Sequence, residues 1–237
     1  MKRLQEKDPI WFAVAWIVLY CVVSVPIRGN QGDESVQMCL ALGVIAAALA
    51  LTVALTRQGK YYGLDHWPET GKKLLWLLPL WLLTTGNLWG GIVPVYSGTA
   101  QVYAVVSMAL IGFIEEMIFR GFLFRAMLEK HGARTAVIVS AVTFGIGHLV
   151  NLFAGQGSWA SVMQVLFAIS WGFVFTLVYY KSGSLLPCIL AHSLVDVFSK
   201  YSTDSLIADW SYVIATIVIG GAYSLWLVRQ DSALPES

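Results

Sequence analysis

The chain has 237 residues, of which 57% are hydrophobic and only 12% are charged, against roughly 45–50% and 25% in soluble globular domains. Together with a mean hydropathy of +0.69, this excludes an ordinary soluble protein, because so few charges cannot cover a surface rich in Trp, Phe and Leu. A net charge of +1 without runs of like charge also excludes nucleic acid as a partner. The composition therefore predicts an integral membrane protein whose constant partner is membrane lipid.

Eight mostly apolar segments are long enough to be candidate spanning helices, which need about 20 residues each. The expected fold class is all-α: a polytopic membrane protein with a bundle of about eight transmembrane helices in a single domain, residues 1–237. The first segment is too long for a signal peptide and lacks a cleavage site, whereas the seventh is short and could be re-entrant. In chain order, the segments are 9–27, 36–56, 74–95, 101–124, 135–154, 159–180, 184–199 and 206–228.

Lys and Arg residues gather on one side of this predicted bundle. Positive residues concentrate on the cytoplasmic side of membrane proteins, so the alternation of eight helices predicts that both termini are cytoplasmic. The opposite side has only Arg28 and Lys200. The cytoplasmic side has Lys2, Arg3, Lys7, Arg57, Lys60, Lys72, Lys73, Arg120, Arg125, Lys130, Arg134, Lys181 and Arg229.

Five ionisable side chains fall within the predicted spans: Glu115 and Glu116 in the fourth helix, His148 in the fifth, and His192 and Asp196 in the seventh. A charge at the bilayer centre costs about 2.5–3.5 kcal/mol on insertion scales, so such residues usually face the bundle interior and mark a functional site. We therefore expect the three helices to surround one polar intramembrane cavity.

Residue spacing supports this convergence. Glu116 and Arg120 are four residues apart, as are His192 and Asp196, so each pair lies on one helix face within contact range. The pair of Glu116 and Arg120 could equally be a purely structural ion pair.

The fifth predicted helix adds supporting groups around His148. Phe144 precedes it by four residues and can wall the ring with apolar surface, while Asn151 follows by three and could support the site or join two helices. Small residues permit close helix approach in membranes. Those near the predicted cavity are Gly145, Gly147 and Gly172.

Depth in the membrane is a further test of convergence. At 1.5 Å per residue, Glu115 lies about 9 Å, His192 about 12 Å and His148 about 18 Å from the cytoplasmic edge. The fourth helix is expected to continue past the membrane to a cap at Gly132. These depths predict a cavity in the inner half to the middle of the membrane, open toward the cytosol.

In these motifs the sequence resembles the CPBP intramembrane proteases, the family that includes type II CAAX prenyl endopeptidases and bacteriocin-processing or self-immunity proteins. The matching segments are Glu115 to Arg120 for EExxxR, Phe144 to His148 for FxxxH, and His192 to Asp196 for HxxxN/D. They occur in order, each in a separate apolar segment, within a core at residues 101–200. Each motif alone is weak, but the ordered combination is specific.

The resemblance implies a role for each motif residue. Glu115 would be the general base that activates water, His148 would hold that water, and Glu116 would pair with Arg120. His192 and Asp196 would face the carbonyl oxygen of the scissile peptide. Because an ionised Asp196 cannot donate to an oxyanion, it would either orient His192 or be protonated.

The residue chemistry agrees with peptide hydrolysis, since an imidazole N–H stabilising an oxyanion contributes about 3–4 kcal/mol in known cases. Two histidines and a carboxylate, His148, His192 and Glu115, would also suit a catalytic zinc with one water. No HExxH motif is present. The expectation is a glutamate-type hydrolase that requires no cofactor, with zinc as the alternative.

The sequence therefore predicts an intramembrane endopeptidase that cuts a membrane-tethered peptide or protein near the cytosolic face. The substrate could be prenylated or bear a leader; neither its identity nor the oligomeric state follows from the sequence. One alternative is a proton-coupled transporter, for which inverted repeats or broken helices in matching halves would be expected and are not found. The other is a catalytically idle membrane scaffold or immunity protein.

Overall fold

The computed structural model describes residues 7–68, 75–155, 157–203, 205–231 and 233–234. All regular secondary structure in these ranges is helical, which confirms the all-α class. The α-helices are α2 (Pro9–Gln31), α3 (Val36–Thr56), α5 (Leu78–Thr84), α6 (Gly98–Glu116), α7 (Arg125–Gly147), α8 (Ser158–Ser182), α9 (Leu186–Phe198) and α10 (Leu206–Val228). Short helices of other types are η1 (Gly86–Leu88), the π-helix η2 (Met117–Phe124), η3 (His148–Leu152) and η4 (Ser199–Tyr201).

The expected count of about eight spanning helices is not confirmed. Among the described residues, five helices are long and apolar enough to cross a membrane. They are Pro9–Gln31, Val36–Thr56, Gly98–Leu152, Ala160–Ser182 and Leu206–Val228. Two of the eight predicted segments, 74–95 and 184–199, contain only shorter helices.

Helix-breaking residues explain the first of these two exceptions. Among residues 76–95, regular helix is limited to the seven residues of α5 and the three of η1. Pro79 opens α5, and the segment after it contains Gly86, Gly90, Gly91 and Pro94, residues that disfavour continuous helix. Hydropathy alone gave no sign of this interruption.

The second exception, α9, has 13 residues, a length of about 20 Å. It begins with Pro187 at its first turn and continues into η4. Its main neighbour is α6, and it also packs against α5 and α8, so it lies inside the bundle. Protein rather than lipid therefore surrounds much of this short helix.

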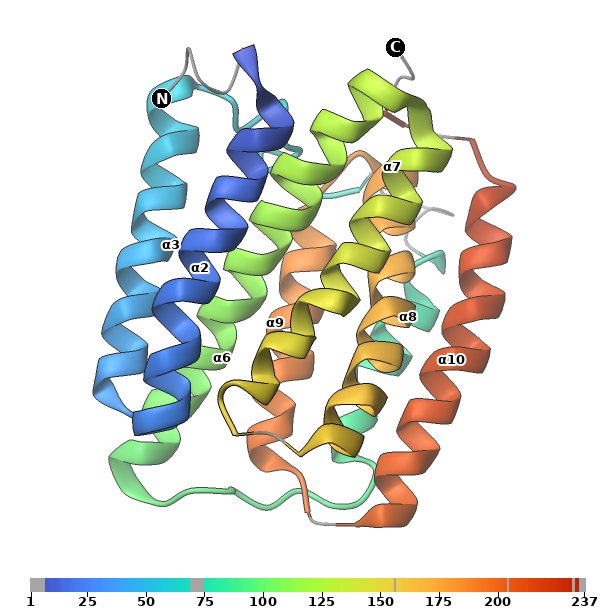
Figure 1. Ribbon diagram of the computed structural model, residues 1–237. Helices are drawn as coiled ribbons and strands as arrows, with labels where there is room; N and C mark the ends of the chain where they lie inside the picture. The colour runs from blue at the N-terminus through green and yellow to red at the C-terminus, as the bar shows by residue number, and fades with distance from the viewer. Residues whose placement is uncertain (1–6, 69–74, 156, 204, 232, 235–237) are drawn as a thin grey trace.

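The long helical segment 98–152 reverses direction at Gly132. Its α6 part continues through the π-helix η2 into the first residues of α7, and Gly132 then adopts φ 76° and ψ 169°. This positive φ favours glycine. Figure 1 shows α6 running to one end of the bundle and the rest of α7 returning beside it. The predicted turn at Gly132 is thus confirmed.

Two of the three predicted glycines allow helices α7 and α8 to approach closely. A Cβ atom on Gly172 would lie 2.8–3.2 Å from backbone atoms of Ala141, and one on Gly145 would lie 2.2 Å from Ile169. Gly147 has no such constraint, since its nearest neighbour would be Phe119 at 3.8 Å. The α7–α8 contact therefore depends on Gly145 and Gly172.

The start of α2 and the end of α10 lie at the same end of the bundle (Figure 1). The connections after α2, before α6, after η3 and before α10 lie at the other end. The end that holds the start of α2 and the end of α10 is called the terminal end, and the opposite end is called the distal end.

Replacing Gly172 with alanine should destabilise the protein by about 1–3 kcal/mol, because the new methyl group overlaps backbone that cannot move aside cheaply. The measurement is reversible unfolding or thermal melting in detergent. Gly43→Ala in α3 is the matched control, because its Cβ would meet nothing within 4 Å. Equal stability of the two variants would contradict the close contact between α7 and α8.

Candidate active site

One cavity of about 430 Å³ opens inside the bundle, and all four predicted catalytic side chains line it. They come from three parts of the chain: Glu115 from α6, His148 from η3, and His192 and Asp196 from α9. Residues of α2, α8 and α10 complete the walls. The structure therefore brings together the motif residues that lie up to 81 positions apart in the sequence.

Glu116 and Arg120 form the predicted ion pair, with Arg120 Nη1 2.8 Å from Glu116 Oε1. Neither side chain is exposed. The same Glu116 oxygen also accepts a hydrogen bond from Nδ1 of His192 at 2.8 Å. A buried charge is tolerated only when it is paired and hydrogen-bonded, and here the pairing also connects α6 with α9.

Arg120 is held on its other sides by α8 and by aromatic rings. Its Nη2 donates to the Gly172 carbonyl oxygen at 3.3 Å, and its Nε donates to Thr176 Oγ1 at 3.4 Å. The guanidinium carbon lies 4.3 Å from the ring centre of Phe144 and 5.4 Å from that of Phe175. Such cation–π contacts stabilise a desolvated cation.

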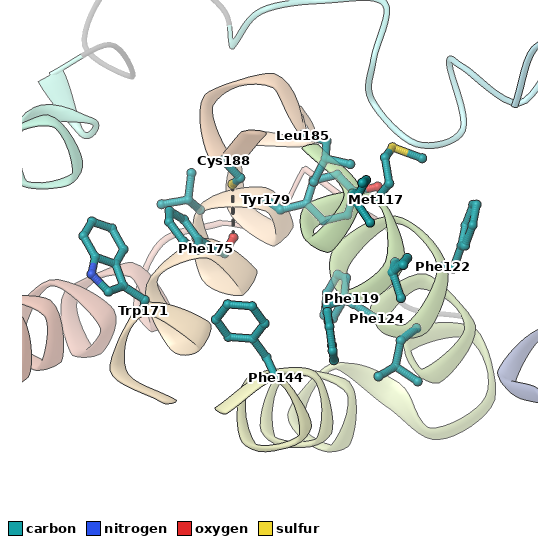
Figure 2. Packing of buried hydrophobic residues seen from close by; sticks show 14 of the residues in the cluster. Met117, Phe119, Phe122, Phe124, Phe144, Trp171, Phe175, Tyr179, Leu185 and Cys188 are labelled. Atoms are coloured by element: carbon teal, nitrogen blue, oxygen red, sulfur yellow. Dashed lines mark hydrogen bonds between the residues drawn. The ribbon is translucent and has the colours of Figure 1, made fainter. Parts of the chain in front are cut away.

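The aromatic wall of the site is visible in Figure 2, where Phe144 and Phe175 are labelled near Phe119 and Trp171. The His192 ring stacks on Phe175 at 5.2 Å and meets the edge of Phe144 at 5.5 Å. Phe144 also contacts the His148 ring at 5.0 Å. Phe144 therefore touches both imidazoles and Arg120, which is more than the wall for His148 that the sequence predicted.

In each histidine, the Nδ1 atom lies within hydrogen-bond distance of an acceptor oxygen. Nδ1 of His148 lies 2.9 Å from the Phe144 carbonyl oxygen, and Nδ1 of His192 faces Glu116. A carbonyl or carboxylate oxygen only accepts hydrogen bonds, so both Nδ1 atoms are donors. In each ring, Nε2 is the nitrogen left for chemistry in the cavity.

Glu115 has two different carboxylate oxygens. Oε1 accepts a hydrogen bond from the Tyr20 hydroxyl at 2.9 Å. Oε2 has no hydrogen-bond partner among the described residues and lies 3.7 Å from Nε2 of His192. Asp196 Oδ2 lies 3.6 Å from the same nitrogen. His192 Nε2 is thus close to the carboxylates of both Glu115 and Asp196.

Asn151 lies at the distal end of the cavity and joins three helical elements. Its Oδ1 accepts from Arg28 Nη1 at 3.1 Å, and its Nδ2 donates to Gln164 Oε1 at 2.9 Å. It therefore links η3 with α2 and α8. This is the helix-joining role that the sequence left open, at a position that also lines the cavity.

The cavity extends to the distal end of the bundle, where its lining includes Arg28, Asp33 and Lys200. Asp33 accepts from Arg28 Nε at 2.8 Å and from Lys200 Nζ at 3.1 Å. Burial opposes ionisation of Asp33, but the two cations outweigh it and lower its pKa below the ordinary value. An ionised Asp33 therefore holds three parts of the cavity mouth together.

The cavity lining reaches the distal end of the bundle, opposite the start of α2 and the end of α10. The sequence predicts cytoplasmic termini together with a cavity open to the cytosol, and the membrane side of each stays a prediction. The helical limb that holds Glu115 runs from Gly98 to Gly132, as expected, so Glu115 lies about 25 Å from either end of that limb. Arg120, counted above among loop cations, is buried in the bundle.

The alternative zinc site finds no support in the side-chain arrangement. Across the described ranges, no three His, Cys, Asp or Glu side chains are grouped so that they could hold a metal ion. The proposed set of Glu115, His148 and His192 shares a cavity but does not form such a group.

Sequence reasoning missed the α2 contribution to the site, above all Tyr20. Its hydroxyl reaches a carboxylate 95 positions away, and a single tyrosine in an apolar helix looks like a packing residue. The only available sign was the spacing of Tyr20, Ser24 and Arg28, which places all three polar groups on one helix face.

Comparison with known proteins agrees with the motifs. Residues 98–198 match the family model of the type II CAAX prenyl endopeptidases, Rce1-like. The Bacillus subtilis (strain 168) protein named "Putative membrane peptidase YdiL" is 30% identical over 212 residues, which cover 83% of this chain and 72% of that protein. The chain belongs to this family of membrane proteases, the CPBP family.

Arg120→Leu should lower the free energy of unfolding by about 3–5 kcal/mol, because it leaves the Glu116 carboxylate buried without its cation. Chemical or thermal unfolding in detergent measures the change. Arg134→Leu, at an exposed position of α7, is the control and should stay within about 0.5 kcal/mol of wild type. An Arg120→Leu protein as stable as this control would contradict the role assigned to the pair.

Proposed function

We propose that this protein is an intramembrane endopeptidase in which Glu115 activates water to hydrolyse a peptide bond. The observation that carries the proposal is the pair of Glu115 Oε2 and His192 Nε2, 3.7 Å apart on the wall of one cavity. A buried carboxylate oxygen without a partner is costly. Oε2 is therefore the atom expected to bind the hydrolytic water, with His148 Nε2 as a second acceptor.

The reaction runs in two proton-balanced steps. Glu115 Oε2 takes a proton from water as the oxygen of that water attacks the scissile carbonyl carbon, which gives a tetrahedral oxyanion. The protonated Glu115 then delivers the proton to the amide nitrogen as the C–N bond breaks, releasing a carboxylic acid and an amine. General base and acid catalysis of this kind contributes about 10²–10⁴-fold.

His192 stabilises the oxyanion through Nε2. Because its Nδ1–H is engaged by Glu116, the ring must be doubly protonated to donate from Nε2. The adjacent carboxylates of Glu115, Glu116 and Asp196 provide the negative charge that an imidazolium requires nearby. Asp196 thus orients and balances His192 and does not itself donate to the oxyanion.

The substrate that fits is a membrane-tethered peptide or protein presented at the distal end. A volume of about 430 Å³ is within the range of small-ligand sites, so a short extended segment can enter, but not a folded domain. The polar lining at the distal end, with Arg28, Asp33, Asn151 and Lys200, suits a peptide backbone arriving from water.

Loop charge supports a cytoplasmic position of the terminal end. Among the described residues, Lys7, Arg57, Lys60, Lys130, Arg134 and Arg229 lie at or next to the connections of that end. The cations of the distal end are Arg28 and Lys200, both paired with Asp33. Of the other expected cytoplasmic cations, Lys2, Arg3, Lys72 and Lys73 lie outside the described residues. By the positive-inside rule, the cavity then opens on the non-cytoplasmic side, which favours a leader-bearing exported peptide over a cytosolic prenylated protein.

Cleavage of a membrane-tethered peptide library by the purified protein tests the chemistry. Glu115→Gln keeps the shape of the side chain but removes the base, so its turnover should fall at least about 100-fold. His148→Ala should also be impaired, because it loses the second water contact. Glu129→Gln, which alters an exposed carboxylate outside the cavity, should cleave like wild type.

Three results of this assay would contradict parts of the proposal. Equal cleavage by wild type and Glu115→Gln would exclude Glu115 as the base. Loss of activity with a strong chelator and rescue by zinc would overturn the metal-free mechanism. No cleavage by any form would favour the catalytically idle scaffold.

Thiol labelling in intact cells tests the orientation. Single cysteines are placed at Ser97 at the distal end and at Lys60 at the terminal end, both exposed, after replacement of Cys21, Cys39 and Cys188. A membrane-impermeant maleimide should label Ser97→Cys in intact cells and Lys60→Cys only after permeabilisation. The reverse pattern would place the cavity mouth in the cytosol.

A further inference from the structure

Helix α2 presents one continuous stripe of residues to the bundle interior. Phe12, Trp16, Tyr20, Ser24 and Arg28 follow one another at intervals of four, so they share a helix face. The first four are buried, and the last three line the cavity. The stripe is thus apolar near the terminal end and polar along the cavity.

The apolar half of the stripe fixes α2 against the π-helix η2, which directly follows Glu115 and Glu116. The Phe12 and Trp16 rings lie 5.1 Å and 6.4 Å from the ring of Phe122. Two turns further along α2, the Ser24 hydroxyl donates to the Tyr20 carbonyl oxygen at 2.7 Å. The Tyr20 side chain therefore projects from a helix that is anchored on the same segment as the proposed base.

We propose that Tyr20 is a positioning residue for Glu115, an inference that rests on the proposed function. Its hydroxyl donates to Oε1 at 2.9 Å and thereby directs Oε2 toward Nε2 of His192. The hydrogen bond restricts rotation of the carboxylate about its terminal bond, so one oxygen stays directed at the water. Tyr20 lies outside the matched residues 98–198, so α2 adds a functional group to the motif core.

The hydrogen bond between Tyr20 and Glu115 should affect the rate of turnover. A carboxylate held by only its own side-chain torsions can turn so that neither oxygen points at the reacting position. A hydrogen bond from a neutral hydroxyl to a carboxylate is among the stronger protein hydrogen bonds. Losing it should reduce the fraction of time that Oε2 and His192 Nε2 face the same water, which lowers turnover more than substrate binding.

The test compares Tyr20→Phe with Tyr223→Phe in the cleavage assay of the full-length protein. Tyr20→Phe keeps the ring and removes the hydroxyl, and kcat should fall about 10- to 30-fold while KM changes less than threefold. Tyr223 is buried in α10, away from the cavity, and its hydroxyl has no partner among the described residues. Tyr223→Phe should therefore keep the wild-type kcat, and melting temperatures of both variants check that folding is intact.

The same Tyr20→Phe substitution, made in a Glu115→Asp protein, separates a positioning role from a general structural effect. In Glu115→Asp the shorter side chain cannot reach both Tyr20 and the water, so adding Tyr20→Phe should lower the residual kcat less than threefold. A structural role would instead reduce kcat equally in both backgrounds, and that result would overturn the inference.

The remaining outcomes distinguish this inference from the proposed function. Wild-type kcat in a folded Tyr20→Phe protein, with Glu115→Gln inactive, would contradict the positioning role and leave the protease assignment intact. Absence of cleavage by wild type and Tyr223→Phe would contradict the proposed function, and the inference would fall with it.

Discussion

One carboxylate oxygen, Oε1 of Glu116, connects the parts of the molecule on which the site depends. It accepts one hydrogen bond from Arg120 Nη1 and another from His192 Nδ1, each at 2.8 Å. Arg120 in turn donates to Gly172 and Thr176 of α8. These buried polar contacts link α6, α8 and α9 and restrict how the three helices rotate and slide relative to one another.

This arrangement separates the tasks of two adjacent glutamates. Glu116 is fully buried and its Oε1 accepts hydrogen bonds from both Arg120 and His192, so it serves to hold His192 in one orientation. Glu115 has one oxygen bound by Tyr20 and one directed toward His192 Nε2. A buried ion pair is weak support for stability in general, because desolvation offsets much of the attraction. Its value here lies in orientation, since it leaves a single nitrogen of His192 facing the cavity.

The sequence was sufficient for the parts of the structure that depend on local spacing. The ion pair of Glu116 and Arg120, the neighbouring His192 and Asp196, and the turn at Gly132 all follow from rules that act within a few residues. The convergence of three polar faces was also predictable, because ionisable groups in a membrane have few alternatives to a shared interior.

Long-range features could not be predicted in the same way. The contact between Tyr20 and Glu115 depends on how α2 packs against the π-helix, which no local pattern specifies. Hydropathy registers α9 and the segment 74–95 as apolar but cannot tell a spanning helix from a short one enclosed by protein. The end of the bundle that the cavity reaches depends in the same way on packing, because residues of α2, η3 and α9 line it together.

The most direct test is an experimental structure of the Glu115→Gln protein in a lipid bilayer with an uncleaved peptide bound. The central claim is that the scissile carbonyl lies between residue 115 and His192. The account predicts the carbonyl oxygen within hydrogen-bond distance of His192 Nε2, with the carbonyl carbon facing the side chain at 115 and the peptide entering from the distal end. A peptide bound with its scissile bond away from both side chains would contradict it.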